Sequence, residues 1–417
     1  MNPNPRRRLG WKILGTVVGA ILLAVLVGSI WTSIVADRRA AALEKDLAAL
    51  REEVERQTPL RLPRRGEALE GNAWDDYAQA LAVTSRAQRK TINTVYNGTE
   101  KLPPEQMTEL LASGDAAFDH LRRGLRRRTG GYPYVWEEGV TGKSPSLFDC
   151  QTLSNFAGIR ARRLLQDGKA REAADLMLDD CSFARDLTLR APLIYHMIAA
   201  AIYSTAFFEL RDVMKSRDLT REELEAIDRE LEQVEKEWPD IGDTLPFEIL
   251  STGYELLKPR ELRDPDARAS VAESWRFGFS PRIAEADAFD ELRAIGRALS
   301  GISRRPWSDA RRISGELETR IHGNRNPLVR RLLQWNVRNL ESDRELRANL
   351  QLLRAGARFR ATGKLPIVAD PYGDTLRTEL KGDRLKIWSV GPNGVDDGGS
   401  GDWRRKMGKD MVYEVAR

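Results

Sequence analysis

Histidine is the side chain best suited to acid–base or metal chemistry near neutral pH, and this chain has three: His120, His196 and His322. None has a second His three or four residues away, so the paired spacing of a zinc hydrolase is absent. The segment Gly139–Ser144 resembles the end of a phosphate-binding loop, but Glu137 stands where that motif needs its first Gly. No Gly-x-Ser-x-Gly motif is present, so we predict no catalytic residues, and the sequence favours a protein that is not an enzyme.

Cys150 and Cys181 are the 2 cysteines of the chain. In an oxidising compartment they can form one disulfide, closing a loop of about 30 residues and stabilising the fold by roughly 3–4 kcal/mol in the chain-entropy model. Two buried free thiols fit the sequence equally well. Both alternatives stay open at this point.

The composition predicts a folded protein with a mixed surface. Of 417 residues, 41% are hydrophobic and 31% are charged, enough to build a core and to solvate its outside. The 67 basic residues are nearly balanced by 62 acidic ones, giving a net charge of +5. So small an excess does not indicate nucleic-acid binding.

Ile13–Val35 is an uncharged run that is long enough to span a bilayer core of about 30 Å. A cleavable signal peptide has a shorter apolar region, of about 7–15 residues, although Ala40–Ala42 resembles a cleavage site. We therefore expect an uncleaved transmembrane helix over 13–35. The basic residues before it predict that 1–12 is a cytoplasmic tail, with the bulk of the chain in the periplasm of a bacterium, anchored in its inner (cytoplasmic) membrane.

After this run, Leu43, Leu47, Leu50 and Val54 recur at helical spacing. This pattern predicts a helical stalk over 36–58. A short coiled coil is the alternative, and it would give a weak homodimer through the same face.

Residues 59–325 have the pattern of an irregular antiparallel helical body, with helices expected over 72–81, 104–128, 192–216, 220–238 and 244–257. Thr220–Glu223 matches a capping box, which marks a helix start. The two runs in 156–178 meet at Asp-Gly and resemble one helix-turn-helix unit of the tetratricopeptide type, without a second copy near 34 residues away. The aromatic loop 130–136 is either packed over these helices or a binding surface.

The chain ends in a predicted small α+β unit, residues 326–417. A long helix over 326–360 is followed by alternating segments at 376–380 and 385–390, separated by Gly382-Asp383, which together predict an antiparallel hairpin. Residues 412–415 are expected to add a third strand. The fold class is therefore mainly α, with this unit at its end.

Three motifs of this unit resemble the soluble domain of the type II secretion major pseudopilins. They are Gly363–Pro366 after the helix, Asp370–Gly373 before the hairpin, and Ser389–Gly394 after it. The resemblance covers roughly 70 of the 417 residues. The chain departs from the family at its anchor, because the fifth residue after Gly10 is Gly15 instead of Glu.

This resemblance implies a calcium site in the acidic loop that follows the hairpin. The candidate oxygen ligands are Asn393, Asp396, Asp397 and Asp402. A polar turn without an ion is the alternative, and no other cofactor is expected.

We thus expect a single-pass, membrane-anchored extracytoplasmic protein that acts by binding or scaffolding. Its expected partners are the lipid bilayer, through 13–35, and proteins of the envelope or of a secretion system. One alternative is an accessory component of a type II secretion or pilus-like system. Another is an envelope hydrolase whose site the sequence does not reveal.

Overall fold

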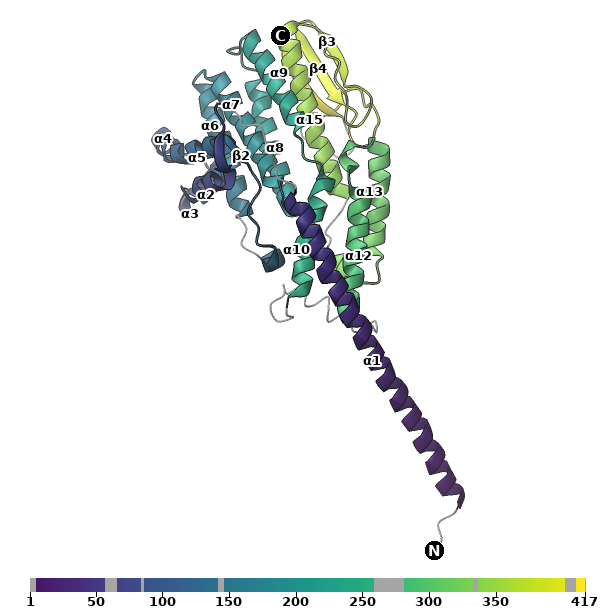
Figure 1. Ribbon diagram of the computed structural model, residues 1–417. Helices are drawn as coiled ribbons and strands as arrows, with labels where there is room; N and C mark the ends of the chain where they lie inside the picture. Colours follow the sequence, from purple (N-terminus) through teal and green to yellow (C-terminus); the bar gives the residue numbers. More distant parts are fainter. Residues whose placement is uncertain are drawn as a thin grey trace.

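The computed structural model describes residues 5–56, 66–83, 86–141, 146–258, 281–332, 337–401 and 410–416. Its longest element is α1 (Pro5–Arg56), a single helix of 52 residues. One half of α1 projects from the body, and the C-terminus lies at the opposite end of the molecule (Figure 1). The segments expected as an anchor and a stalk are therefore one unbroken helix.

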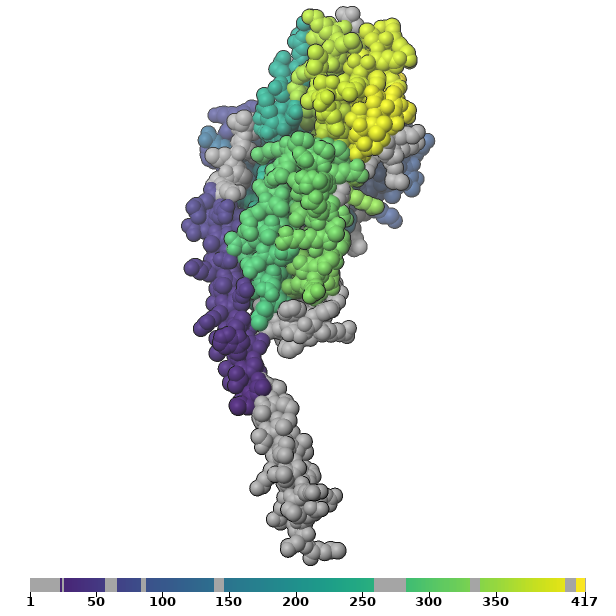
Figure 2. Space-filling model, turned by 90° about the vertical axis from the view of Figure 1, so that its right-hand side faces the viewer, coloured from purple at the N-terminus to yellow at the C-terminus, as the bar shows by residue number. Residues whose placement is uncertain are grey.

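The C-terminal half of α1 is built into the body instead of standing free. Leu43, Leu47 and Val54 are buried, and they pack against α10 (Leu245–Leu257) and α12 (Pro281–Leu299). A Cβ at Gly253 of α10 would lie 2.3 Å from Leu47 Cδ2, so this Gly allows the close approach. Helical spacing predicts a buried face but not its partner, and here the same chain covers the face that a coiled coil needs. Figure 2 shows α1 along the flank of the body.

The body is an irregular array of antiparallel helices. Its helices before α10 are α2 (Ala73–Val83), α3 (Arg86–Tyr96), α4 (Pro104–Ser113), α5 (Asp115–Leu125), α6 (Leu147–Gln166), α7 (Ala170–Thr188), α8 (Leu193–Val213) and α9 (Arg221–Lys236). After α12 follow α13 (Trp307–His322) and α14 (Pro327–Leu332), and short 3-10 turns are η1 (Trp136–Thr141), η2 (Ile241–Thr244) and η5 (Ile302–Arg304). The core is centred on α6, α7 and α8, where Phe156, Phe183 and Phe207 are fully buried.

Several helix starts and turns form where short sequence motifs predict them, and one helix break does not. The α6–α7 hairpin turns at Gly168, whose φ of 74° suits a residue without a Cβ. The capping box of α9 forms in both directions between Thr220 and Glu223. The helix expected over 104–128 is instead divided into α4 and α5 at Gly114, where a Cβ would lie 2.3 Å from the ring of Phe156. β1 (Leu69–Asn72) and β2 (Arg127–Thr129), a short parallel pair, were not expected.

The C-terminal unit has the predicted three-stranded antiparallel sheet. β3 (Arg377–Lys381), β4 (Arg384–Ser389) and β5 (Met411–Ala416) pair in the order β3-β4-β5, so the mainly helical fold with a small sheet is confirmed. The sheet packs on α15 (Val337–Thr362), which also contacts α8, α9 and α13. A Cβ at Gly356 would lie 2.4 Å from the ring of Tyr413, which shows how closely β5 approaches this helix.

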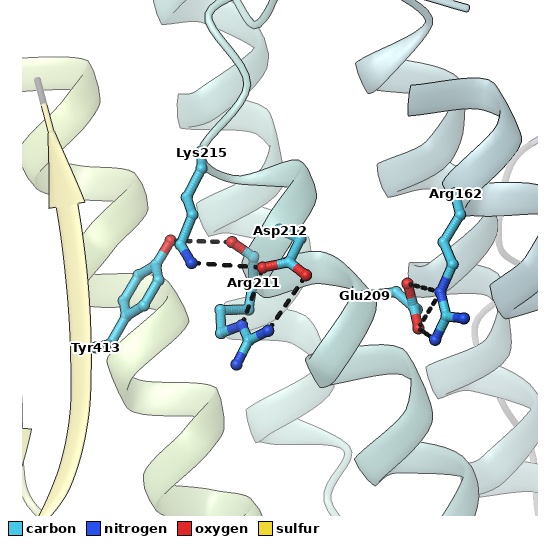
Figure 3. A network of polar contacts seen from close by, with 6 residues as sticks. All are labelled: Arg162, Glu209, Arg211, Asp212, Lys215 and Tyr413. Atoms are coloured by element: carbon cyan, nitrogen blue, oxygen red, sulfur yellow. Dashed lines mark hydrogen bonds and ion pairs between the residues drawn. The ribbon is translucent and has the colours of Figure 1, made fainter. Parts of the chain in front are cut away.

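The last turns of α8 join the sheet to the helical body (Figure 3). Glu209 is buried and accepts a forked pair of hydrogen bonds from Arg162 of α6, the shortest 2.6 Å. Two residues later, the carbonyl of Arg211 accepts a hydrogen bond from the Tyr413 hydroxyl of β5 at 3.5 Å. The C-terminal unit is therefore packed into the body as a layer, and α15 belongs to both.

Candidate functional site

A cleft of about 1010 Å³ opens where α1, α7, α9, η2, α10 and α12 converge. Its apolar lining includes Leu50 of α1 together with Phe247 and Ile249 of α10. Charged lining residues come from α1, from the ends of α7 and α9 and the residues after them, from η2 and from α12. No single stretch of sequence contains this site, because four stretches far apart in the chain build it: 50–53, 185–190, 233–249 and 293–300.

Three basic residues of the cleft lie at helix ends, while Arg190 follows α7 and Arg293 lies within α12, where it pairs with Asp46 of α1 at 2.9 Å. The last turns of α7, α9 and α12 carry Arg185, Lys236 and Arg297, and all three residues line the cleft. The C-terminus of a helix has a partial negative charge, which a cation in the last turn offsets. The helix ends therefore account for these three cations without a ligand.

Arg190 holds the end of α1 in place. It is the one non-Gly residue with positive φ, 57°, in the part of the chain that the structure describes. A left-handed backbone at such a residue costs on the order of 1–3 kcal/mol and persists only when its surroundings enforce it. Here the Arg190 guanidinium donates to the carbonyls of Val54, at 3.3 Å, and Glu55. The strained turn after α7 thus clamps α1 as a wall of the cleft.

Glu237, a carboxylate of this cleft, is satisfied within the protein. It accepts hydrogen bonds from Arg185 and, at 2.6 Å, from Gln233. Arg185 also donates to Asp186 at 3.0 Å, and Asp186 in turn accepts from the Tyr77 hydroxyl. Arg185, Asp186 and Tyr77 of this network are buried, Glu237 is half-buried, and the network fixes the end of α7 against the end of α9.

Asp240 and Asp243 at η2 are less completely paired. Oδ1 of Asp240 accepts from the amide of Gly242 at 2.8 Å, but its Oδ2 has no hydrogen-bond donor among the described residues. The Arg304 side chain, 72% exposed, lies 3.6 Å from each carboxylate. Burial and the charge of Asp240 raise the pKa of Asp243. Asp240 and Asp243 both line the cleft, but Asp240 is only 1% exposed and its Oδ2 is buried.

The structure places His196 inside the protein, away from this cleft. Its Nε2 lies 3.6 Å from Asp343 Oδ1, and Asp343 also accepts from Trp238 at 2.8 Å and Arg347 at 3.1 Å. Burial opposes ionisation of Asp343, but Arg347 and His196 outweigh it and hold its pKa below the ordinary range. This cluster ties α8 and the link after α9 to α15, and it does not line the cleft. His120 and His322 lie elsewhere, on α5 and at the end of α13.

Cys150 and Cys181 are both free and buried. Burial raises the pKa of the Cys150 thiol to about 12, which keeps it protonated and unreactive. The two thiols are not joined in this structure, and the disulfide stays a prediction.

The acidic loop after the hairpin is organised by the protein itself. Asp396 accepts from an indole at 2.9 Å and from a backbone amide at 3.0 Å, and Asn393 donates to Asp397 at 3.4 Å. Asp410, which the sequence did not single out, accepts two loop amides at 3.2 and 2.7 Å. No three His, Cys, Asp or Glu side chains are grouped to hold a metal within the described residues, and Asp402 lies outside them. The calcium site stays a prediction.

Two of the motifs that resemble pseudopilins are joined by one buried carboxylate. Asp370 accepts from the amide of Tyr372 at 3.0 Å, the hydroxyl of Ser389 at 2.7 Å and the amide of Val390 at 3.0 Å. Burial raises its pKa, while these donors oppose that shift. The motifs thus have a local structural role, in which the loop before β3 is fastened to the end of β4.

No family model, no curated protein and no solved structure matches this chain. The resemblance to pseudopilins therefore stays an expectation from three short motifs.

Proposed function

We propose that this is a single-pass, membrane-anchored protein whose body binds a ligand or partner outside the cytoplasm. The observation that carries the proposal is the surface of α1 before it enters the body. Large apolar side chains there are open to solvent, including Leu23 at 61%, Ile30 at 52% and Trp31 at 68%. An unbroken apolar helix surface of this kind is unfavourable in water, and a bilayer would cover it.

α8 is the one helix among the described residues that passes a test of length and mean hydropathy for a membrane span. However, 61% of its most apolar window is buried within the body, as in the core helix of a water-soluble domain. The proposal therefore assigns the membrane to α1 and the core to α8.

The continuity of α1 supports a fixed geometry between membrane and cleft. Val35 and Leu50 are 15 residues apart on one helix. At about 1.5 Å per residue, the cleft would stand roughly 22 Å above the edge of the bilayer. A ligand of this cleft would then come from the aqueous phase, because a lipid headgroup in the membrane would not reach it.

A binding role fits the cleft better than hydrolysis. Among the described lining residues there is no His or Cys, and the buried His196–Asp343 pair lies elsewhere. The role as an accessory component of a secretion system is favoured only by the C-terminal motifs. Co-purification from membranes would separate the two: recovery of secretion components supports the accessory role, and their absence argues against it.

Anchoring is tested by fractionating cells that produce the full chain. We expect the protein in the membrane fraction, resistant to alkaline carbonate extraction, and its body digested by protease added to spheroplasts. A protein released by carbonate would contradict the anchor. A body protected in spheroplasts but digested after lysis would contradict the extracytoplasmic orientation.

A further inference from the structure

A second, smaller cavity of about 260 Å³ lies between the first turns of α12 and the link that joins α13 to α14. These parts of the body lie at the end from which α1 projects (Figure 1). Among the described residues, the charged side chains that line the cavity are Asp287 and Glu291 of α12 and Arg325 of the link. The cavity therefore offers charges of both signs.

The position of this cavity along α1 follows from ion pairs between α1 and α12. Asp287 of α12 lies 4.0 Å from Arg39 of α1. Further along both helices, Arg293 lies 2.9 Å from Asp46, so α12 runs beside α1 in the same direction. Arg39 is 4 residues beyond Val35, where the proposed membrane span ends. At about 1.5 Å per residue, Asp287 then stands roughly 6 Å from the bilayer core, within a headgroup layer of about 5–8 Å.

Arg325 is held at this cavity without a partner of its own. The side chain of its neighbour Asn326 donates to the carbonyl of Ala284 at 2.7 Å, and the amide of Asn326 donates to the side chain of Asn324 at 2.8 Å. These bonds fix the link against α12. The Arg325 side chain is exposed, and within the described ranges of the chain it makes no hydrogen bond or ion pair.

The two carboxylates of the cavity differ in how they are paired. Glu291 is occupied by Arg320, which donates to both of its oxygens at 2.6 and 2.7 Å. Asp287 is 44% exposed, and its ion pair with Arg39 at 4.0 Å is too long for a hydrogen bond. Arg39 lies closer to Asp290, at 3.3 Å. The cavity thus contains one carboxylate and one guanidinium that are each free to bind a ligand group, and these two do not pair with each other.

We propose that this cavity binds the headgroup of a zwitterionic phospholipid with a primary amine, the chemistry of phosphatidylethanolamine. The guanidinium of Arg325 can donate two parallel hydrogen bonds to the phosphate. The ammonium group, which has three donors, binds the carboxylate of Asp287. The acyl chains enter the bilayer beside the apolar surface of α1, where Ile30 and Ile34 are 52% and 43% exposed.

The same chemistry separates this lipid from two others. The trimethylammonium group of phosphatidylcholine has no hydrogen to donate to Asp287, and the glycerol headgroup of phosphatidylglycerol has no cation. The inference rests on the proposed membrane anchor, and it adds the class of lipid that the chain selects.

The test is native mass spectrometry of the detergent-solubilised full chain, titrated separately with these three lipids. We expect phosphatidylethanolamine to bind at least about tenfold more tightly than the other two, since a hydrogen bond to a charged group contributes that much. Arg325→Gln should weaken its binding at least about tenfold, and Asp287→Asn should abolish the preference over phosphatidylcholine. The matched controls are Arg217→Gln, in the link between α8 and α9, and Asp309→Asn, on α13. Both change exposed residues that do not line the cavity, and both should bind as the wild type does.

Equal binding of the three lipids would overturn the proposal, and so would a preference for phosphatidylethanolamine that survives in both cavity variants. Tightest binding of phosphatidylglycerol would overturn the assignment of a zwitterionic headgroup. Thermal unfolding of each variant, followed by circular dichroism, checks that the fold is kept. A chain that resists carbonate extraction but shows no lipid preference refutes the headgroup site alone, whereas release by carbonate refutes the anchor.

Discussion

Asp180 should make the stability of this protein depend on pH. It lies in α7, completely buried, where its Oδ2 accepts a hydrogen bond from the Ser154 hydroxyl at 2.5 Å. Its Oδ1 has no hydrogen-bond partner in the described part of the chain. Burial raises the pKa of Asp180 from 3.8 to about 7, although the Ser154 donor opposes the shift. Near neutral pH the protein therefore holds a carboxyl group that is close to losing its proton in an apolar interior.

The direction and size of the effect of pH on stability follow from this shift in pKa. The folded protein keeps a proton that the unfolded chain releases above about pH 4, so the stabilisation is complete below that pH and is lost as pH rises through 7. A difference of one in pKa corresponds to about 1.4 kcal/mol, so a rise of about 3 corresponds to a loss of free energy of unfolding on the order of 4 kcal/mol. Between about pH 5 and pH 8, roughly 3 kcal/mol of that loss should be measurable.

Asp180→Asn tests this reasoning, because an amide of the same shape cannot ionise. Urea unfolding of the detergent-solubilised full chain would be followed by circular dichroism at both pH values. The free energy of unfolding of the wild type should fall by roughly 3 kcal/mol more than that of the variant between pH 5 and pH 8. Asp309→Asn, which removes an exposed carboxylate, should track the wild type. Parallel pH profiles for wild type and Asp180→Asn would refute the assignment of a raised pKa.

Three further predictions concern the C-terminal unit. Gly356→Ala should lower the free energy of unfolding by about 1–3 kcal/mol, because the new Cβ would lie 2.4 Å from the Tyr413 ring; unchanged urea midpoints would contradict this close contact. Asp370→Ala should cost about 2–3 kcal/mol, since it leaves Ser389 and two amides without their acceptor, and faster hydrogen exchange at the end of β4 would report it. If the 393–397 loop binds calcium, the melting temperature should rise with calcium and fall with chelator; no change would end that hypothesis.

Elements set by local sequence could be predicted from it. The capping box at Thr220 formed because its two hydrogen bonds involve residues only three apart. The hairpin formed around Gly382 because alternation and turn chemistry are also local. By contrast, the break at Gly114 is set by Phe156, some 40 residues later, whose ring occupies the space. Helical periodicity in one segment contains no information about such a contact.

The candidate site was less accessible to prediction than the fold. Asp240 and Asp243 stand in a short link between two helices, and in the sequence they look like any polar connection. Their significance comes from burial of one carboxylate and from the walls that α1 and α10 supply. The one signal in the sequence was the occurrence of two carboxylates, Asp240 and Asp243, around Gly242 and directly after Trp238-Pro239. An ordinary exposed turn does not require both carboxylates.

The position of α1 links the proposed membrane anchor to the cleft physically. The helix that carries the exposed apolar surface at its N-terminal half also supplies Leu50 and Glu53 to the cleft, and Arg190 fastens its end. Removing residues 1–56 to obtain a soluble protein would therefore remove one wall of the cleft. It would also expose the α10 and α12 surfaces that Leu47 and its neighbours cover. Ligand binding to the cleft therefore has to be measured on the chain with α1 in place.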